Sequence, residues 1–269
     1  MAMHRKKDGS PASCCMNSST AKMTDLIVGY GEVGQALMEV LKERHSIEVH
    51  DPPKGLEYYA PINEYEWMHV CIPYTDTFVE TVTSYIKLFR PSHIVIHSTV
   101  AVGTTRRIAH DNITYSPVRG IHPNIARYIR EFPKWFATTD DEDAVLSYFQ
   151  PCGISMRRAP SIESLEWMKL FETTEYGYRI VLWQEIERQA EMPEVRGFAT
   201  KEEVMNAMKE WLFEKRKVYD GDRGLVPIMF GGSIGGHCVK ENWELLRPLM
   251  TPELYAWLTI SQSLRERLP

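Results

Sequence analysis

The stretch of residues 25–51 constrains the fold of this chain most strongly. A short apolar run, residues 26–28, leads directly into glycines at Gly29, Gly31 and Gly34. Beyond this turn, apolar residues recur at the spacing of one helical face: Val33, Ala36, Leu37, Val40 and Leu41. Because the period of the apolar pattern changes at the glycines, the sequence predicts a buried strand, a tight turn and a helix.

The spacing of the glycines is typical of a turn that binds the pyrophosphate of a dinucleotide. Such a turn is sharp, and its backbone approaches the phosphates so closely that no side chain larger than hydrogen fits. A helix that begins near Glu32 presents free N–H groups and the positive end of its dipole to the phosphates. An ordinary strand, turn and helix is the alternative, because single G-x-G-x-x-G matches also arise by chance.

An acidic residue further along the chain supports cofactor binding. A second short strand is predicted at residues 47–50, and it ends on Asp51, which lies 22 positions after Gly29 (51 minus 29). Dinucleotide-binding folds place the acid that binds the ribose hydroxyls in this register. Since Asp51 would repel a phosphate at the 2′ position, we expect NAD rather than NADP as the cofactor.

The composition is that of a soluble globular protein and argues against several classes of partner. The net charge is −5 and the basic residues are scattered along the chain, so we expect no nucleic-acid partner. No apolar run approaches the length that spans a bilayer, so we expect no membrane partner. The five cysteines are odd in number and form no C-x-x-C pair. We therefore expect neither a disulfide framework nor a metal site, and we place the protein in the reducing cytoplasm.

Residues 1–23 are expected to form a disordered tail, and residues 24–158 show strands alternating with helices. After the first two strands, strands or helices are predicted at residues 68–72, 77–89, 93–97 and 144–149. The alternation predicts a Rossmann-type doubly wound parallel sheet, in which ligands bind at the carboxyl ends of the strands. The residues predicted to bind the cofactor are Gly29, Gly31, Glu32, Val33, Gly34, Asp51, Pro73, Ser98 and Thr99.

Residues 159–269 are expected to form a smaller, all-helical substrate and dimerisation domain. A long helix is predicted at residues 162–189, and its apolar residues cover more than one face, which is typical of a helix at a domain or subunit junction. We expect a homodimer built on this helix, with a core that includes Trp167, Phe171, Ile180 and Trp183. Thr200 and Glu203 form a capping box before another helix, and Thr251 with Pro252 begins the last one.

Six short segments, in order along residues 24–245, resemble motifs of the UDP-glucose/GDP-mannose dehydrogenase family. They are GYGEVG, VCIPYTDT, HSTVAVGTT, SPVRG, the helix LEWMKLFETTEYGYRIVLWQEI and the glycine-rich loop GGSIGGHCV. The resemblance implies an enzyme that oxidises the alcohol of a sugar nucleotide to a carboxylate with two molecules of NAD. It also implies a short form of the family, because the chain stops where the family's second nucleotide-binding domain would begin.

The resemblance implies a catalytic role for four residues. Cys238 matches the cysteine that attacks the intermediate aldehyde, and Lys169 matches the lysine whose charge stabilises the oxyanion. Thr99 matches a threonine that orients water and substrate. Asn242 stands where the family has an aspartate. The alternatives are a buried structural cysteine, a surface lysine paired with a neighbouring glutamate, and a strand-end hydroxyl that caps a turn.

Three polar positions depart from the family pattern. Val118 replaces the glutamate of the family's S-P-E segment, Thr173 replaces an asparagine, and Asn242 replaces the aspartate. Valine takes no proton and asparagine is no base, so hydrolysis of a thioester is the step most affected. Two further readings therefore stay open: a two-electron dehydrogenase of a smaller hydroxy acid or sugar that uses Lys169 alone, and a catalytically silent NAD-binding protein.

Overall fold

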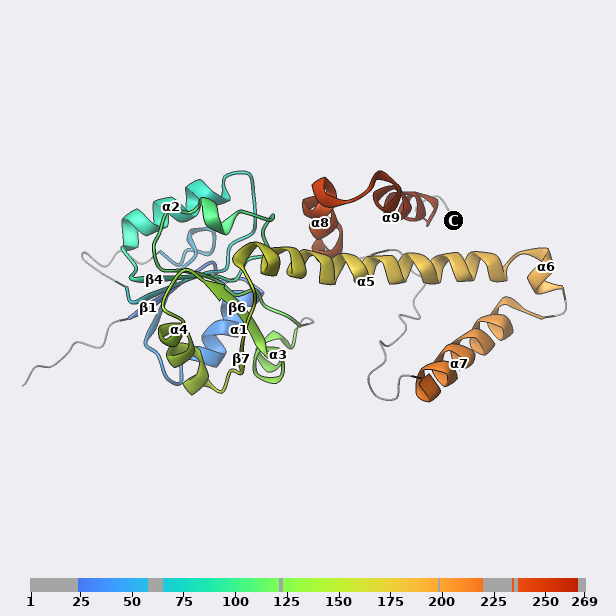
Figure 1. Ribbon diagram of the computed structural model, residues 1–269, viewed down its shortest axis with the longest axis horizontal. Helices are drawn as coiled ribbons and strands as arrows, with labels where there is room; N and C mark the ends of the chain where they lie inside the picture. The colour runs from blue at the N-terminus through green and yellow to red at the C-terminus, as the bar shows by residue number, and fades with distance from the viewer. Residues whose placement is uncertain are drawn as a thin grey trace, which may run out of the picture.

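A mostly parallel sheet of seven strands forms the N-terminal part of the chain (Figure 1). The computed structural model describes residues 24–57, 65–120, 123–197, 199–219, 234 and 237–265. The strands are β1 (Asp25–Val28), β2 (Ile47–His50), β3 (Trp67–Val70), β4 (His93–Ile96), β5 (Ile113–Tyr115), β6 (Lys134–Thr138) and β7 (Met156–Arg158). Their order across the sheet is β2-β1-β3-β4-β5-β6-β7. The predicted Rossmann-type class is confirmed.

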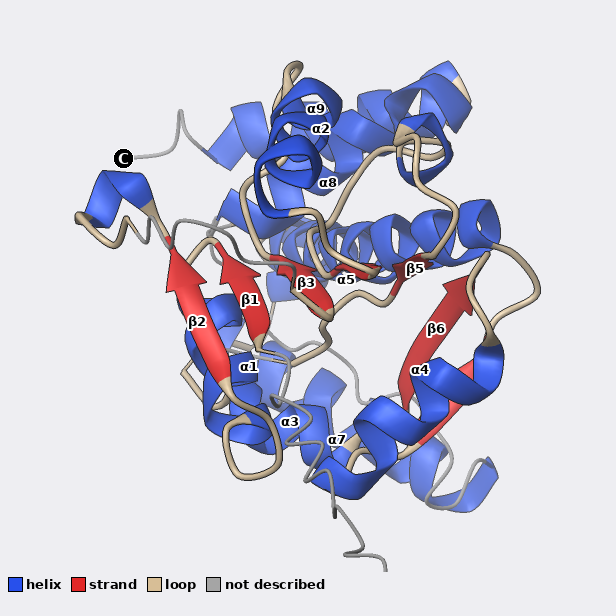
Figure 2. Ribbon diagram, turned by 90° about the vertical axis from the view of Figure 1, so that its left-hand side faces the viewer, coloured by secondary structure: helices blue, strands red, loops and turns tan. Residues whose placement is uncertain are grey.

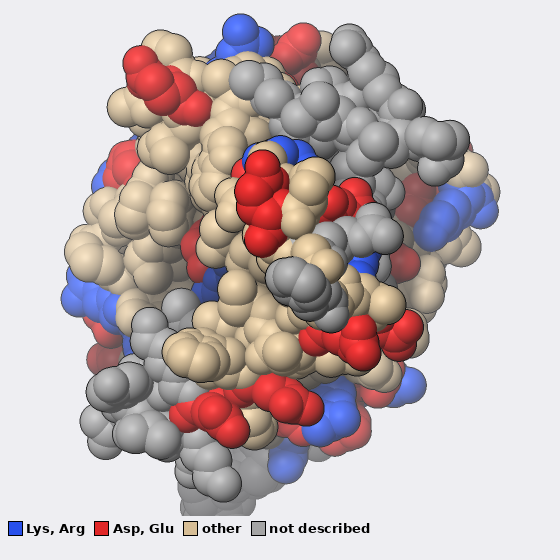
Figure 3. Space-filling model, turned by 90° about the vertical axis from the view of Figure 1, so that its right-hand side faces the viewer, with Lys and Arg blue, Asp and Glu red and all other residues tan. Residues whose placement is uncertain are grey.

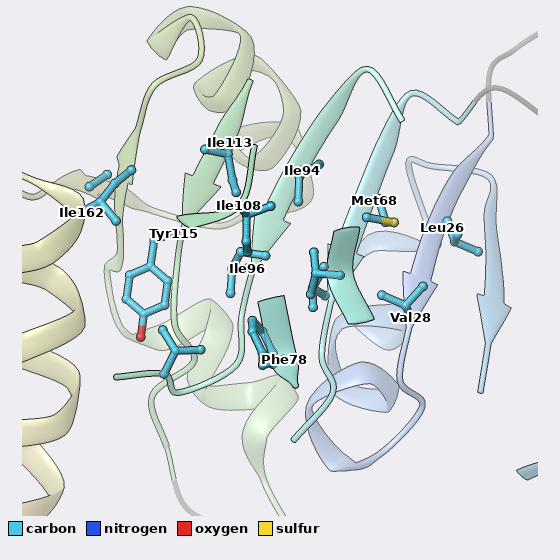
Figure 4. Packing of buried hydrophobic residues seen from close by; sticks show 14 of the residues in the cluster. Leu26, Val28, Met68, Phe78, Ile94, Ile96, Ile108, Ile113, Tyr115 and Ile162 are labelled. Atoms are coloured by element: carbon cyan, nitrogen blue, oxygen red, sulfur yellow. The ribbon is translucent and has the colours of Figure 1, made fainter. Parts of the chain in front are cut away.

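Helices cover both faces of this sheet. Figure 2 shows α2 (Phe78–Phe89) on one face and α1 (Glu32–Leu41), α3 (Ile125–Glu131) and α4 (Glu142–Phe149) on the other. Short 3-10 turns are η1 (Pro52–Lys54), η2 (Thr105–Arg107) and η3 (Gln150–Cys152). Alternate strand residues point to opposite faces, so Leu26 and Val28 join the apolar cluster beneath α2, and Ile27 joins the cluster beneath α1 (Figure 4).

The sheet departs from the sequence prediction in two respects. The strand expected at residues 68–72 ends at Val70, which leaves the following residues as a loop at the sheet edge. The pair β5 and β6 is antiparallel, with Thr114 opposite Thr138, whereas the other described pairs are parallel. The distribution of apolar runs along the sequence does not reveal whether two strands are parallel or antiparallel, because strand direction depends on the path of the connecting segment.

The rest of the described chain is helical, with elements α5 (Ile162–Ala190), α6 (Pro193–Arg196), α7 (Lys201–Tyr219), α8 (His237–Leu246), η5 (Arg247–Leu249) and α9 (Pro252–Arg265). In Figure 1, α5 extends away from the sheet, and α8 and α9 lie along α5. Helix α7 turns back from the end of α5 that is farthest from the sheet. A capping box begins α7, as predicted, because the Glu203 amide donates to Thr200 Oγ1 at 3.3 Å and the Glu203 carboxylate accepts from the Thr200 amide.

Different stretches of α5 bury different faces. Its first turn packs against the sheet through Ile162 and Leu165, and its middle packs against α8 and α9 through Ile180. Its last turns pack against α7 through Trp183. At Gly177, an added Cβ would lie 3.0 Å from a methyl group of Val239, so this glycine permits the close approach of α8. The changing partners explain why the apolar residues do not follow a single stripe.

Charged side chains are distributed over the surface, and no described helix is long and apolar enough to cross a membrane. On the face shown in Figure 3, acidic groups are interspersed with uncharged side chains and scattered basic groups. The expected tail, residues 1–23, lies outside the described residues, as does most of the glycine-rich run before Cys238.

A buried carboxylate, Asp25 at the start of β1, pairs with His45 beyond α1. His45 Nδ1 lies 3.3 Å from Asp25 Oδ2, and the ring also reaches the backbone oxygen of Tyr148. Burial by itself disfavours the charged ring, but the hydrogen bonds to Asp25 and Cys152 outweigh it and raise the pKa of His45 to about 9. No local sequence pattern predicts this ion pair.

The pair gives stability a defined pH dependence. The pKa of His45 is higher in the folded state than its ordinary value of 6.5, so its contribution is fully present below that value and is lost as the pH rises to about 9. We expect His45→Gln to lower the free energy of unfolding by about 1 kcal/mol at about pH 6, with little effect at about pH 10. Urea unfolding at both pH values, with His110→Gln as the control, measures this. An equal loss at both values would contradict it.

Candidate functional site

The glycine turn between β1 and α1 has two structural glycines and one that faces open space. Gly29 has φ +89°, and an added Cβ there would lie 2.8 Å from the backbone of Cys71. A Cβ on Gly34 would lie 2.1 Å from the carbonyl oxygen of Gly29. Apart from the residues adjacent to Gly31, no atom of the described chain lies within 4 Å of the position of a Cβ there. Gly29 and Gly34 are therefore required by the fold itself, and Gly31 borders the space in front of the helix.

Asp51 lies beside this turn, because β2 runs parallel to β1 with His50 paired to Val28. The backbone N–H of Tyr30 donates to Asp51 Oδ2 at 2.8 Å. Lys54 Nζ donates to the carbonyl oxygen of Tyr30 at 2.6 Å. The acid therefore takes the position that the sequence predicts, and Lys54 adds a positive charge near it that the sequence analysis did not consider.

The residues around the turn fit a dinucleotide. The first turn of α1 begins at Glu32, whose side chain is exposed. The Val33 side chain packs against the apolar cluster beneath α1, while its backbone N–H lies in the first turn of the helix. No side chain caps this terminus at Gly31, so its N–H groups face the open space beside that glycine. Phosphates bound there would have neither a Cβ nor a capping side chain in the way.

The other predicted cofactor residues follow β3, which is next to β1 in the sheet, and β4, which is next to β3. Ser98 Oγ donates to the carbonyl oxygen of Ile72 at 2.6 Å, so this hydroxyl joins the ends of the two strands. Pro73 is exposed and Thr99 is half-buried. Because parallel strands share a carboxyl edge, these residues and the glycine turn lie at the same edge of the sheet.

A cavity of about 300 Å³ opens beside α5 and the segment after β5. Its lining residues are Pro117, Arg119, Trp135, Leu165, Met168, Lys169 and Glu172. Lys169 Nζ lies 3.6 Å from Glu172 Oε2, and an Arg119 N–H donates to Glu172 Oε1 at 2.8 Å. The cavity thus has apolar walls with two cationic groups and one carboxylate.

Lys169 is mostly buried, in contrast to the alternative of a surface lysine. Its side chain is 13% exposed. Burial lowers the pKa of the Lys169 amine, and the charge of Glu172 acts in the opposite direction. Glu166, the glutamate three positions before Lys169, is fully buried and accepts hydrogen bonds from the amides of Gly103 and Thr105 instead. That contact joins α5 to the loop after β4.

Cys238 lies in the first turn of α8, which the sequence analysis interpreted as a loop. Cys238 is exposed as a residue, but its thiol is partly buried. This burial and the charge of Glu241 raise the pKa of Cys238. The charges of Lys169 and of Glu32, which lies beside the glycine turn, both act on the thiol. Cys238 is not among the described residues that line the cavity.

Two of the positions that depart from the family pattern contact each other. Asn242 is buried, and its Nδ2 donates to Thr173 Oγ1 at 2.7 Å, which links α8 to α5. The third position, Val118, packs with the apolar cluster beneath α1. Arg119 and Trp135 were not predicted as cavity residues, although Arg119 directly follows Val118 in the segment SPVRG.

Comparison with protein-family models and with curated proteins gives no match. Solved structures do match. UDP-D-ManNAc dehydrogenase from Pyrococcus horikoshii is 14% identical with a TM-score of 0.66, and the match covers 91% of this chain and 68% of that one. A 3-hydroxyisobutyrate dehydrogenase from Mycobacterium tuberculosis is 13% identical with a TM-score of 0.65, covering 91% and 94%. Psf3 in complex with NADP+ and 2-OPP is 13% identical with a TM-score of 0.58, covering 90% and 94%. The chain thus shares its fold with known dehydrogenases.

Proposed function

We propose that the protein is an NAD-dependent dehydrogenase that oxidises a CH–OH group of a small molecule. The observation that carries the proposal is the placement of a buried lysine, Lys169, in a cavity at the carboxyl edge of a sheet whose first turn fits a dinucleotide. Pro117 of the cavity follows β5 at the same carboxyl edge as the glycine turn, which supports the view that the cavity and the turn belong to one site.

The residues of the cavity have distinct roles in this proposal. A bound nicotinamide dinucleotide supplies the hydride acceptor. Lys169 stabilises the negative charge that develops on the alcohol oxygen as its proton leaves. Arg119 and Lys169 together exceed the single negative charge of Glu172, so the site favours a substrate with an acidic group. Trp135 and Met168 pack against its apolar part.

A second candidate, oxidation of a sugar-nucleotide alcohol to a carboxylate, is favoured by the position of Cys238. In this reaction, the thiolate adds to the aldehyde formed by the first oxidation. Loss of a second hydride leaves a thioester, and water hydrolyses it to the acid and the free thiol. The raised pKa of Cys238 disfavours the thiolate, and neither Val118 nor Asn242 provides a base for the hydrolysis. We therefore rank the two-electron reaction first.

The number of NADH molecules formed per substrate separates the two candidates. Purified protein is incubated with NAD and a panel of hydroxy acids, sugars and sugar nucleotides, and NADH is followed by absorbance. We expect one NADH per substrate in the wild type and in Cys238→Ser. Two NADH in the wild type, with Cys238→Ser stalled after the first oxidation and an acyl adduct on the wild type in intact-mass spectra, would establish the cysteine mechanism. NAD binding without turnover of any compound would favour the catalytically silent protein.

We further propose a homodimer formed through the outer face of α5. Of the four residues predicted for its core, Ile180 and Trp183 are buried within the chain. Trp167 and Phe171 are 44% and 42% exposed and stack on each other at 5.2 Å between ring centroids. Such an exposed aromatic pair is typical of an interface.

Light scattering on the wild type should give twice the mass of the chain, and Phe171→Glu should shift the protein to the monomer because it places a charge in the interface. Leu88→Glu on α2, at a residue that is 57% exposed, is the matched control and should leave the dimer intact. A wild-type monomer at micromolar concentration would refute this interface.

A further inference from the structure

Lys134, at the start of β6, is a buried lysine to which the proposed reaction assigns no role. It is 5% exposed. Its Nζ donates to the carbonyl oxygen of Ser116 at 2.8 Å and also approaches that of Pro117 at 3.3 Å. Burial lowers the pKa of Lys134 to about 7, but an amine donates hydrogen bonds in its charged and neutral forms alike. The Lys134 side chain therefore hydrogen-bonds to two successive backbone carbonyl groups.

His97, which follows β4, also hydrogen-bonds to the carbonyl group of Ser116. Its Nδ1 lies 2.8 Å from the oxygen of Ser116. A carbonyl oxygen only accepts, so Nδ1 of His97 carries the proton. The opposite nitrogen, Nε2, lies 3.1 Å from Nδ1 of His69. Burial lowers the pKa of His97 well below its usual range and that of His69 to about 4, so both rings are neutral near pH 7.

A buried chain of polar groups continues from His97. The Tyr148 hydroxyl donates to Asp25 Oδ2 at 2.7 Å, so His69 Nε2 donates to the Tyr148 oxygen at 2.8 Å and Nδ1 of the neutral His69 ring carries no proton. These residues come from β1, β3, α4 and the end of β4, and all of them are buried. The His97 ring is therefore held by its donor to Ser116 and by packing against the rings of His69 and Phe149.

The carbonyls held in this way belong to the segment that forms one wall of the cavity. Ser116 is further held by its amide, which donates to Ile96, and by its hydroxyl, which donates to Trp135. Pro117 and Arg119 follow and line the same cavity as Lys169. The guanidinium group of Arg119 reaches Glu172 from this wall. Its position therefore depends on where the backbone of Ser116 and Pro117 is held.

We propose that Lys134 and His97 are positioning residues for Arg119, which they keep facing Lys169 by anchoring the carbonyls of Ser116 and Pro117. The inference rests on the proposed function only in taking the cavity as the substrate site. Neither residue contacts the cavity contents in this proposal. Both act through the backbone of the wall, and the effect of removing them is a loss of order at Arg119.

Two substitutions of His97 separate its donor to Ser116 from its contact with His69. In His97→Asn, the amide nitrogen takes the place of Nδ1 and keeps the donor to Ser116. In His97→Gln, the amide reaches the place of Nε2, so the contact with His69 is kept and the donor to Ser116 is lost. Each variant therefore keeps one of the two contacts of the ring. Lys134→Met is a third variant, which removes the donors of Lys134 while keeping the length of its side chain.

The readout is the Nε–H signal of Arg119 in NMR spectra of arginine-labelled protein, assigned with Arg119→Lys. In the wild type and in His97→Asn we expect one signal with slow exchange with water. In His97→Gln and Lys134→Met we expect exchange to be faster by about fivefold, the factor for loss of one neutral hydrogen bond. With a substrate from the screen, the same two variants should raise KM while kcat changes little.

Equal signals in His97→Asn and His97→Gln, or an unchanged signal in Lys134→Met, would overturn the inference. If His97→Gln does not fold, Lys134→Met decides alone. Calorimetry with NAD is the accompanying measurement, and all three variants should bind it as the wild type does, since the glycine turn is untouched. Absence of NAD binding in the wild type would refute the proposed function, while the NMR comparison would still test the anchoring of Arg119.

Discussion

Gly31→Val is expected to weaken NAD binding by more than about 100-fold, a difference of about 2.7 kcal/mol. Among the described residues beyond its chain neighbours, none has an atom within 4 Å of the position where a Cβ would stand, so valine fits the folded protein without a clash. That same space lies before the N-terminus of α1, where the phosphates of a dinucleotide would approach the backbone. The substitution therefore removes the binding site while leaving the fold intact, and calorimetry with NAD measures the effect.

The glycine positions of this chain offer matched comparisons. Gly34→Ala should lower the melting temperature, because its Cβ would stand 2.1 Å from the oxygen of Gly29. A Cβ on Gly197, which follows α6, would make an ordinary van der Waals contact with the carbonyl oxygen of Pro193. Gly197→Ala should therefore change neither NAD binding nor stability. Undiminished NAD binding in Gly31→Val would refute the site. NADPH binding as tight as NADH would contradict the role of Asp51 and would point to Lys54, which lies within reach of the same turn.

Lys169→Met is expected to lower kcat by about 100-fold to 1,000-fold, the effect of removing a group that stabilises a developing oxyanion. The amine is mostly buried and its pKa is lowered by that burial, so the folded state is disfavoured by carrying its charge. Methionine keeps the length of the side chain without the charge. We therefore expect the variant to be at least as stable as the wild type, and NADH absorbance with a substrate from the screen measures its rate.

The control for this substitution is Lys201→Met, at an exposed lysine of α7 that pairs with Glu191. Such a surface pair contributes about 0–1 kcal/mol, so both rate and stability should stay close to those of the wild type. A Lys169→Met variant with wild-type turnover would exclude both catalytic mechanisms, because each relies on the charge of this lysine. Loss of turnover together with loss of folding would instead assign Lys169 a structural role.

The local elements of the Rossmann-type sheet were predictable because their signals lie close together in the sequence. The change of apolar period at the glycines places β1, the turn and α1 within a single short stretch, and β2 begins and ends at the predicted residues. The capping box before α7 likewise involves residues three positions apart. By contrast, the helix around Cys238 was missed, because the dense glycines before it predicted a loop.

Local spacing along the sequence is enough to predict the alternation of strands and helices, the position of the glycine turn and the placement of Asp51 beside it. Three other features depend on the tertiary fold: Arg119 and Lys169 reach the same carboxylate of Glu172, Asn242 donates to Thr173, and His69 and His97 lie in a buried chain from Asp25 to Ser116. These contacts join residues that are far apart along the chain, and single polar residues carry no pattern that names their partners. Packing of α5 and α8, and of neighbouring strands, brings them within hydrogen-bond distance.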